Sequence, residues 1–220
     1  MKPLILFDIN GTLIKRDSRT DLPYEYAVNE LLSIENGLQG VNTSARSDVD
    51  VMMEILQKHN VEYTEALWEQ FFKLYIKQLK EFKPSDAWRE NGTAVSFVTK
   101  LAEKNYPLAL ITGELGIGAE YKLKKLGIWQ HFATGGFGED GLGRFEIADT
   151  AVKCAKERFN REFDKIFLIG DTVLDIKTAR HIGASVISIT TGSNTREELQ
   201  ELSPDYIIDD FTELSMDIFE

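Results

Sequence analysis

The chain has few basic residues, a single cysteine and no long hydrophobic run. Its 220 residues carry 25 Lys and Arg against 36 Asp and Glu, a formal net charge of -11. That balance argues against binding to nucleic acid or to an anionic membrane surface. Cys154 cannot form a disulfide within the chain, which suits a reducing compartment. The apolar stretch Leu4–Phe7 is too short for a signal peptide, and no stretch approaches membrane-spanning length. We therefore expect a cytoplasmic protein, monomeric or homodimeric, with no nucleic-acid or membrane partner.

The second feature is a regular alternation of helical and strand patterns after Gly92. Short strands without polar residues alternate with helical segments, which is typical of a parallel sheet covered on both faces. Hydrophobic residues make up 43% of the chain, enough for a substantial core. The fold class predicted is α/β with a doubly wound parallel sheet. The predicted strands are 4–7, 108–111, 166–169, 186–189 and 206–208.

The segment from about Thr20 to Phe82 has helical signals only. One helix is predicted around 24–34, a second begins after the capping residue Ser47, and Thr64 opens a longer one with a broad apolar surface. We interpret this segment as a four-helix insert with its own small core rather than as a cofactor site. The domain prediction is therefore a sheet domain of residues 1–15 and 88–220, interrupted by a helical domain of residues 16–87.

Polar side chains stand at the ends of three predicted strands. Asp8 follows the first strand, Thr112 and Gly113 follow the second, and Asp171 follows the third, with Asp175 one turn further on. Each one alone could be a helix cap or a turn residue. Because the carboxyl ends of parallel strands lie along one edge of a sheet, we expect these groups to converge on a site.

These motifs resemble those of the haloacid dehalogenase superfamily. The stretch FDINGTL around Asp8 resembles the first motif, DxDGT, and Thr112 falls in the second. GDTVLD, which ends at Asp175, resembles the fourth motif, GDxxxD. Arg144 lies where the family keeps its third-motif Lys or Arg, and Lys153, within the following helix, is the competing candidate. The tail at 191–206 is similar to phosphoglycolate-phosphatase-like members, and the insert matches their small helical cap.

The resemblance implies a Rossmann-like fold and a phosphatase that acts on a small phosphorylated metabolite. Asp8 would attack phosphorus and form an aspartyl phosphate. Asp8 and Asp171, with the backbone carbonyl of Asn10, would bind Mg²⁺, and Asp175 would lie just behind them.

The remaining roles implied concern the phosphoryl group and the substrate. Thr112 and Gly113 would hold phosphoryl oxygens, and Arg144 would offset their charge. In the cap, Ala45-Arg46-Ser47-Asp48 resembles a family stretch of the type Gly-Arg-Thr-Asp. Its Arg46 could grip a substrate carboxylate or phosphate, or could instead pair with Asp48 or Asp50 and order the helix start.

Asn10 departs from the family pattern at a catalytic position. Family members carry an Asp there, which protonates the leaving oxygen and then activates water, and an amide can do neither. Such acid–base help is worth ~10²–10⁴-fold, so Asn10→Asp is expected to raise turnover. No histidine (His59, His131 or His181) is positioned to replace it. The chain could be a natural low-activity member, an engineered trapped form, or a protein that binds Mg²⁺ and a phospho-ligand with little turnover.

One further motif is set aside. Residues 136–141 fit G-x-G-x-x-G, the pattern of a dinucleotide-binding turn. No strong strand pattern precedes them, and Glu139 and Asp140 would oppose a pyrophosphate. We therefore predict no dinucleotide site here, and Mg²⁺ is the one cofactor expected.

Overall fold

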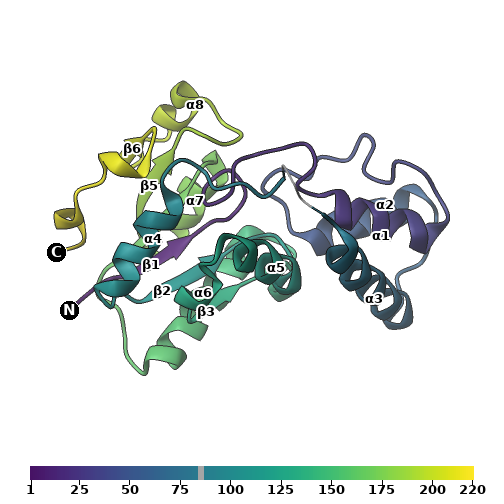
Figure 1. The fold of residues 1–220 in the computed structure, drawn as a ribbon, viewed down its shortest axis with the longest axis horizontal. Helices are drawn as coiled ribbons and strands as arrows, with labels where there is room; N and C mark the ends of the chain where they lie inside the picture. The colour runs from purple at the N-terminus through teal and green to yellow at the C-terminus, as the bar shows by residue number, and fades with distance from the viewer. Residues whose placement is uncertain (84–86) are drawn as a thin grey trace.

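A six-stranded parallel sheet forms the centre of the molecule (Figure 1). The structure is a computed structural model that describes residues 1–83 and 87–220. The strand order is β3-β2-β1-β4-β5-β6, so the first strand of the chain lies in the middle of the sheet. The α/β prediction is confirmed. The strands are β1 (Leu4–Phe7), β2 (Leu108–Ile111), β3 (Thr134–Gly136), β4 (Ile166–Gly170), β5 (Ser185–Ile189) and β6 (Tyr206–Ile208).

Helices cover both faces of this sheet, as its apolar central strands β1, β2 and β4 require. In β1, Ile5 and Phe7 pack with one group of helices, and Leu4 and Leu6 pack with the other. The first group is α4 (Ala94–Glu103) and α5 (Gly116–Leu126). The second is α6 (Arg144–Phe159), α7 (Val173–His181) and α8 (Arg196–Glu201). Complete burial of Phe7 contributes about 2–3 kcal/mol, which anchors the strand that ends at Asp8.

The insert contains three α-helices in its described part, not the four expected. They are α1 (Leu22–Leu32), α2 (Asp48–Lys58) and α3 (Glu65–Glu81). Ser33 caps the end of α1 in the left-handed conformation, and residues 33–47 form a long connection to α2. Ser47 and Thr64 cap α2 and α3 through their side chains, as predicted. Residues 84–86, which belong to the predicted range 16–87, lie outside the described residues.

Two boundaries differ from the predictions. Strand β3 was not predicted, because Thr134–Gly136 is short and carries two glycines instead of an apolar run. A side chain at Gly136 would meet Ala151 at 3.0 Å, so the glycine lets α6 approach the sheet edge. Helix α6 begins at Arg144, so Arg144 lies within the helix that it was expected to precede. Short 3-10 turns occur at Trp129–His131, Gly138–Asp140, Phe211–Glu213 and Met216–Phe219.

The insert lies at one end of the molecule, and both chain termini lie at the other (Figure 1). Direct hydrogen bonds join the insert to the loop after β2: the backbone N–H of Asp48 donates to the carbonyl of Gly113 at 2.7 Å. The Asp48 carboxylate also accepts from the Leu115 N–H at 2.8 Å. No helix in the described residues is long and apolar enough to span a membrane.

Candidate active site

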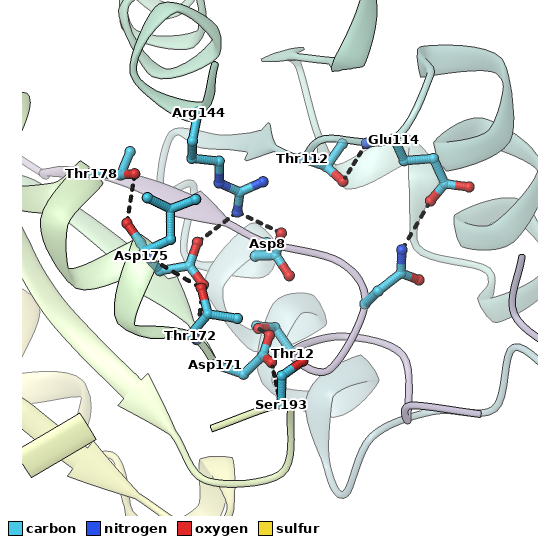
Figure 2. A network of polar contacts seen from close by, with 12 residues as sticks. Asp8, Thr12, Thr112, Glu114, Arg144, Asp171, Thr172, Asp175, Thr178 and Ser193 are labelled. Atoms are coloured by element: carbon cyan, nitrogen blue, oxygen red, sulfur yellow. Dashed lines mark hydrogen bonds and ion pairs between the residues drawn. The ribbon is translucent and has the colours of Figure 1, made fainter. Parts of the chain in front are cut away.

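Asp8, Arg144 and Asp175 meet at the carboxyl edge of the sheet (Figure 2). Arg144 Nη2 donates to Asp8 Oδ1 and to Asp175 Oδ1, both at 2.6 Å. All three residues are buried. Lys153, the competing third-motif candidate, is exposed on α6. The structure therefore places Arg144, and not Lys153, beside the predicted nucleophile.

The start of α6 fixes the position of Arg144. The Glu146 carboxylate accepts from the backbone N–H groups of Leu142 and Gly143, at 2.9 and 3.3 Å. This side chain closes the first turn of the helix and satisfies donors that would otherwise lack partners. Arg144, the first residue of α6, thereby projects across the end of β1.

Asp171 lies behind Asp8, in the loop after β4. Its side chain is completely buried. Thr12 Oγ1 donates to Oδ1 at 3.1 Å, and the Ser193 N–H donates to Oδ2 at 2.9 Å. Gly11 has φ +95°, and a Cβ there would lie 2.5 Å from the Asp171 carboxyl carbon. The glycine after position 10 is thus required both by its backbone and by the approach of Asp171.

Asp175 is engaged on both carboxylate oxygens. Oδ1 accepts from Arg144, and Oδ2 accepts from the N–H and the hydroxyl of Thr172 at 3.0 and 2.7 Å. It therefore orients Arg144 and closes the first turn of α7. This geometry fits the expected place just behind the metal ligands better than direct contact with a metal.

The carboxylates of Asp8, Asp171 and Asp175 lie near the guanidinium of Arg144 at this edge of the sheet, and Arg144 bonds to Asp8 and Asp175. Burial raises the pKa of Asp8 well above its usual range, against the effect of Arg144. Burial and the neighbouring Asp175 raise the pKa of Asp171 to about 6. Such an excess of buried negative charge favours an additional cation.

The donor set fits Mg²⁺ rather than a metal held wholly by side chains. Asp8 and Asp171 offer two carboxylates, and Asn10 can add its backbone carbonyl. Mg²⁺ usually takes one or two carboxylates and completes its octahedron with water. Within residues 1–83 and 87–220, no group of three or more His, Cys, Asp or Glu side chains is arranged to hold a metal.

Thr112 and Gly113 lie where the cap meets the sheet. Thr112 is buried, and its hydroxyl accepts from the Glu114 N–H at 3.2 Å. A side chain at Gly113 would collide with the backbone carbonyl of Arg46, so the glycine permits the cap to approach. The hydroxyl and the glycine face the same cavity as Asp8.

That cavity, of about 830 Å³, is bounded by the end of the sheet and by the insert. Its floor belongs to the loops that follow the strands and to the start of α6, and its other walls belong to the insert and the loops that lead to it. The floor includes Asp8, Asn10, Thr112, Gly113, Glu114 and Arg144, and the insert side includes Thr20, Tyr24, Ser44, Arg46, Asp48 and Tyr75. A small molecule held there would contact both the sheet end and the insert.

Arg46 lies at the edge of this cavity, but its guanidinium is engaged within α2. Nε donates to Asp50 at 2.6 Å, and Nη1 pairs with Glu54 and donates to the carbonyl of Asn42. This arrangement orders the helix start, the second of the two roles considered for Arg46, with Glu54 taking part in addition to Asp50. Contact between Arg46 and a substrate stays a prediction.

Sequence reasoning missed two residues beside Asn10. Asn10 Nδ2 donates to Glu114 Oε2 at 3.5 Å, and Lys122 Nζ donates to Asn10 Oδ1 at 3.4 Å. Lys122 also pairs with Glu114 Oε1 at 2.7 Å. Two features of the sequence could have revealed them: Glu114 is an acid two residues after Thr112, and Lys122 is a lysine on the apolar face of α5. His181, by contrast, contacts Asp149 at the surface.

Gly138 and Glu139, in the rejected G-x-G-x-x-G stretch, do follow a strand, the unpredicted β3. The expected lack of a preceding strand was therefore wrong. Glu139 accepts from the Gly116 N–H at 2.9 and 3.0 Å. Its carboxylate thus occupies the N-terminus of α5, a position that an anionic ligand would need.

Comparisons with known proteins show what this chain is similar to. The model of the haloacid dehalogenase-like hydrolases matches residues 5–180. A phosphoglycolate phosphatase of Agrobacterium fabrum is 25% identical over 224 residues, covering 100% of this chain and 94% of that protein. The crystal structure of a predicted phosphoglycolate phosphatase from Haemophilus somnus has TM-score 0.69 and 21% identity, covering 96% of each chain. An aspartate-to-asparagine mutant of CbbY from Rhodobacter sphaeroides, crystallised with xylulose-(1,5)bisphosphate, has TM-score 0.68 and 15% identity over 100% of both chains.

Proposed function

This chain belongs to the haloacid dehalogenase-like hydrolases, and from that membership we propose that it is a Mg²⁺-dependent phosphatase of a small phosphorylated metabolite. The phosphatases among its relatives support the reaction class, a phosphoric monoester hydrolase. The observation that carries the proposal is the meeting of Asp8 with Arg144 at the floor of the cavity, 2.6 Å apart.

Asp8 is the nucleophile in this proposal. One carboxylate oxygen attacks phosphorus, the bond from phosphorus to the alcohol oxygen breaks, and an aspartyl phosphate forms on Asp8. Water then attacks phosphorus and releases phosphate. Arg144 stabilises the charge on the transferring group, and Thr112 and Gly113 hold its remaining oxygens. Mg²⁺, held by Asp8, Asp171 and the carbonyl of Asn10, would offset the repulsion between the carboxylate and the phosphate.

A second candidate function is binding of a phospho-ligand with little turnover. Asn10 favours it, because an amide cannot transfer the protons that both steps need. The CbbY mutant holds a bisphosphate ligand although one of its aspartates is replaced by asparagine. A protein of this fold can therefore retain a phosphorylated ligand after such a replacement.

Phosphate release separates the two candidates. The native chain is incubated with Mg²⁺ and a panel of phosphorylated metabolites, beside Asp8→Asn and the matched surface control Asp149→Asn. The phosphatase proposal predicts Mg²⁺-dependent release by the native chain and by Asp149→Asn, and none by Asp8→Asn. Tight binding of a panel member with no release by the native chain would support the second candidate. Equal release by the native chain and Asp8→Asn would contradict both.

A further inference from the structure

We propose that Glu114 supplies the proton-transfer carboxylate that position 10 lacks. The inference rests on the proposed phosphatase function and names a catalytic residue for it. Glu114 lines the same cavity as Asp8 and Asn10 and follows Thr112 by two residues. It is 6% exposed, so its carboxylate is shielded from bulk water but borders the space available to a substrate.

The Asn10 amide is matched to Glu114 and Lys122. Its NH₂ group faces the Glu114 carboxylate at 3.5 Å, and its carbonyl oxygen faces the Lys122 ammonium at 3.4 Å. Lys122 is itself buried and lies 2.7 Å from Glu114. Each polar group of the amide therefore has a partner of the opposite kind, and the three side chains form one unit.

A carboxylate at position 10 would not fit this unit. Two carboxylates about 3.5 Å apart repel each other strongly in a buried site, and one of them must then keep its proton. With Asn10 present, the carboxylate that contacts the side chain of position 10 is that of Glu114. The carboxylate available for proton transfer therefore comes from Glu114, in the loop after β2, and position 10 contributes an amide.

Asp17, Asp21, Glu25 and Asp48 also line the cavity. Asp21 lies 3.8 Å from Lys122 with its side chain 44% exposed. Asp17 is bound by Arg19, through Oδ1 at 2.8 Å and Oδ2 at 2.7 Å. Asp48 accepts from the Leu115 N–H at the cap boundary. Glu114 contacts position 10 directly, and this contact singles it out for proton transfer in the described part of the cavity.

The two chemical steps balance with Glu114 as acid and then base. In the first, an Asp8 oxygen bonds to phosphorus, the ester bond to the alcohol oxygen breaks, and that oxygen takes a proton from the Glu114 carboxyl group. In the second, a water oxygen bonds to phosphorus and the bond to Asp8 breaks. A proton of that water passes to Glu114, which restores both residues. Lys122 is a positioning residue that holds the Glu114 carboxylate in place.

Four proteins test the proposal: the native chain, Glu114→Gln, Asn10→Asp, and the double variant Asn10→Asp/Glu114→Gln. We expect Glu114→Gln to lower kcat for the best substrate of the metabolite panel by ~10²–10⁴-fold, with little change in KM. The loss on p-nitrophenyl phosphate should be smaller, because its leaving group needs less protonation. Because Glu114 already supplies the carboxylate, Asn10→Asp alone should change kcat by less than about tenfold, and not by the larger increase expected from the sequence. In the double variant, the new carboxylate should restore most of the turnover that Glu114→Gln loses.

Two further variants separate chemistry from folding. Glu114→Asp keeps a charged partner for Lys122 but withdraws the carboxylate by one methylene, so it should unfold near the native temperature and still lose turnover. Asp149 is exposed on α6 beside His181 and does not line the cavity, and Asp149→Asn is the matched control. Its kcat should stay close to that of the native chain.

The possible results separate a failure of the role proposed for Glu114 from a failure of the proposed phosphatase function. An unchanged kcat in Glu114→Gln overturns the role of Glu114, as does a double variant no more active than Glu114→Gln. If Asn10→Asp turns over the phosphate esters but the native chain does not, the phosphatase proposal stands and the Glu114 proposal is wrong. If neither releases phosphate from any ester tested, both proposals are wrong.

Discussion

At the scale of one residue, Asp171 is both a proposed ligand of Mg²⁺ and a carboxyl group whose pKa the fold raises. Its carboxylate has Thr12 and Ser193 as donors, but burial and Asp175 still raise its pKa to about 6. Mg²⁺ requires the ionised form, so protons compete with the metal below that pH.

We therefore predict that Mg²⁺ affinity falls as the pH drops through 6. Below that point the dissociation constant should rise by at least about tenfold per pH unit, because at least the Asp171 proton must leave for each ion bound and burial raises the pKa of Asp8 as well. Calorimetric titration with Mg²⁺ at about pH 5 and about pH 7.5 measures it. Asp171→Asn should bind weakly at both values, and Asp149→Asn should follow the native curve. A native affinity that does not vary with pH would remove Asp171 from the ligand set.

Arg144 and Lys153 provide a matched pair of cations on α6. Arg144 contacts Asp8 and Asp175, whereas Lys153 is exposed. Arg144→Ala should lower kcat by ~10²–10³-fold, because it removes the positive charge beside the transferring group. Lys153→Ala should leave kcat unchanged. Steady-state kinetics on the best substrate of the metabolite panel checks both, and the reverse order of effects would show that the third-motif cation has been assigned wrongly.

The sequence was sufficient to predict some residues of the site but not others. Asp8, Thr112 and Asp171 follow buried strands, so the parallel arrangement alone brings them to one edge. Glu114 and Lys122 carry no such signal. An acid near a helix start and a lysine in a helix usually face solvent, and only packing of α5 against the cap buries this pair.

At the scale of elements, the contact between α2 and the loop after β2 sets the position of the cap. Asp48 begins α2 and accepts from the Leu115 N–H. Burial raises the pKa of Asp48 well above its usual range, and the charge of Glu114 adds to this effect. The folded chain therefore holds this proton to higher pH than the unfolded chain does.

The sign of the pH effect follows. The contribution of Asp48 to stability is full below its unfolded pKa and is lost as the pH rises through the raised folded value. Asp48→Asn keeps an acceptor for Leu115 and has no proton to lose. Relative to the native chain, its melting temperature should therefore increase with pH, by ~3 °C or more between about pH 4 and about pH 7.5. Thermal unfolding checks this, with the exposed Glu62→Gln as control. A constant difference at both pH values would contradict the account.

The elements that the sequence predicted well are those with strong periodicity or a capping residue. The predicted strands β1 and β2 and the capped starts of α2 and α3 agree with the structure because local sequence determines them. Strand β3 escaped prediction because two of its three residues are glycine: Gly136 permits the approach of α6, and a side chain at Gly135 would collide with Leu110 of β2. The insert has three described helices because its connection 33–47 is held by turns that leave no helical pattern.

At the scale of the whole molecule, the cavity exists because an insert in one connection of the sheet folds back over its carboxyl edge. The family motifs fix the order of the catalytic groups along the chain, and they let the fold and the floor of the site be predicted. The cap side chains follow no such order. For this reason the chain's substrate is left to the metabolite panel, whereas the reaction at Asp8 can be tested directly.

The central claim is that Asp8 attacks phosphorus, and the most direct measurement is the detection of phosphate on Asp8 itself. The native chain is mixed with Mg²⁺ and its best substrate, quenched in acid within the first turnover, digested and analysed by mass spectrometry. We predict a phosphoryl group on the peptide that contains Asp8, formed no more slowly than phosphate is released, and no such group in Asp8→Asn. Phosphate release at the native rate with Asp8 unmodified throughout the first turnover would contradict the account.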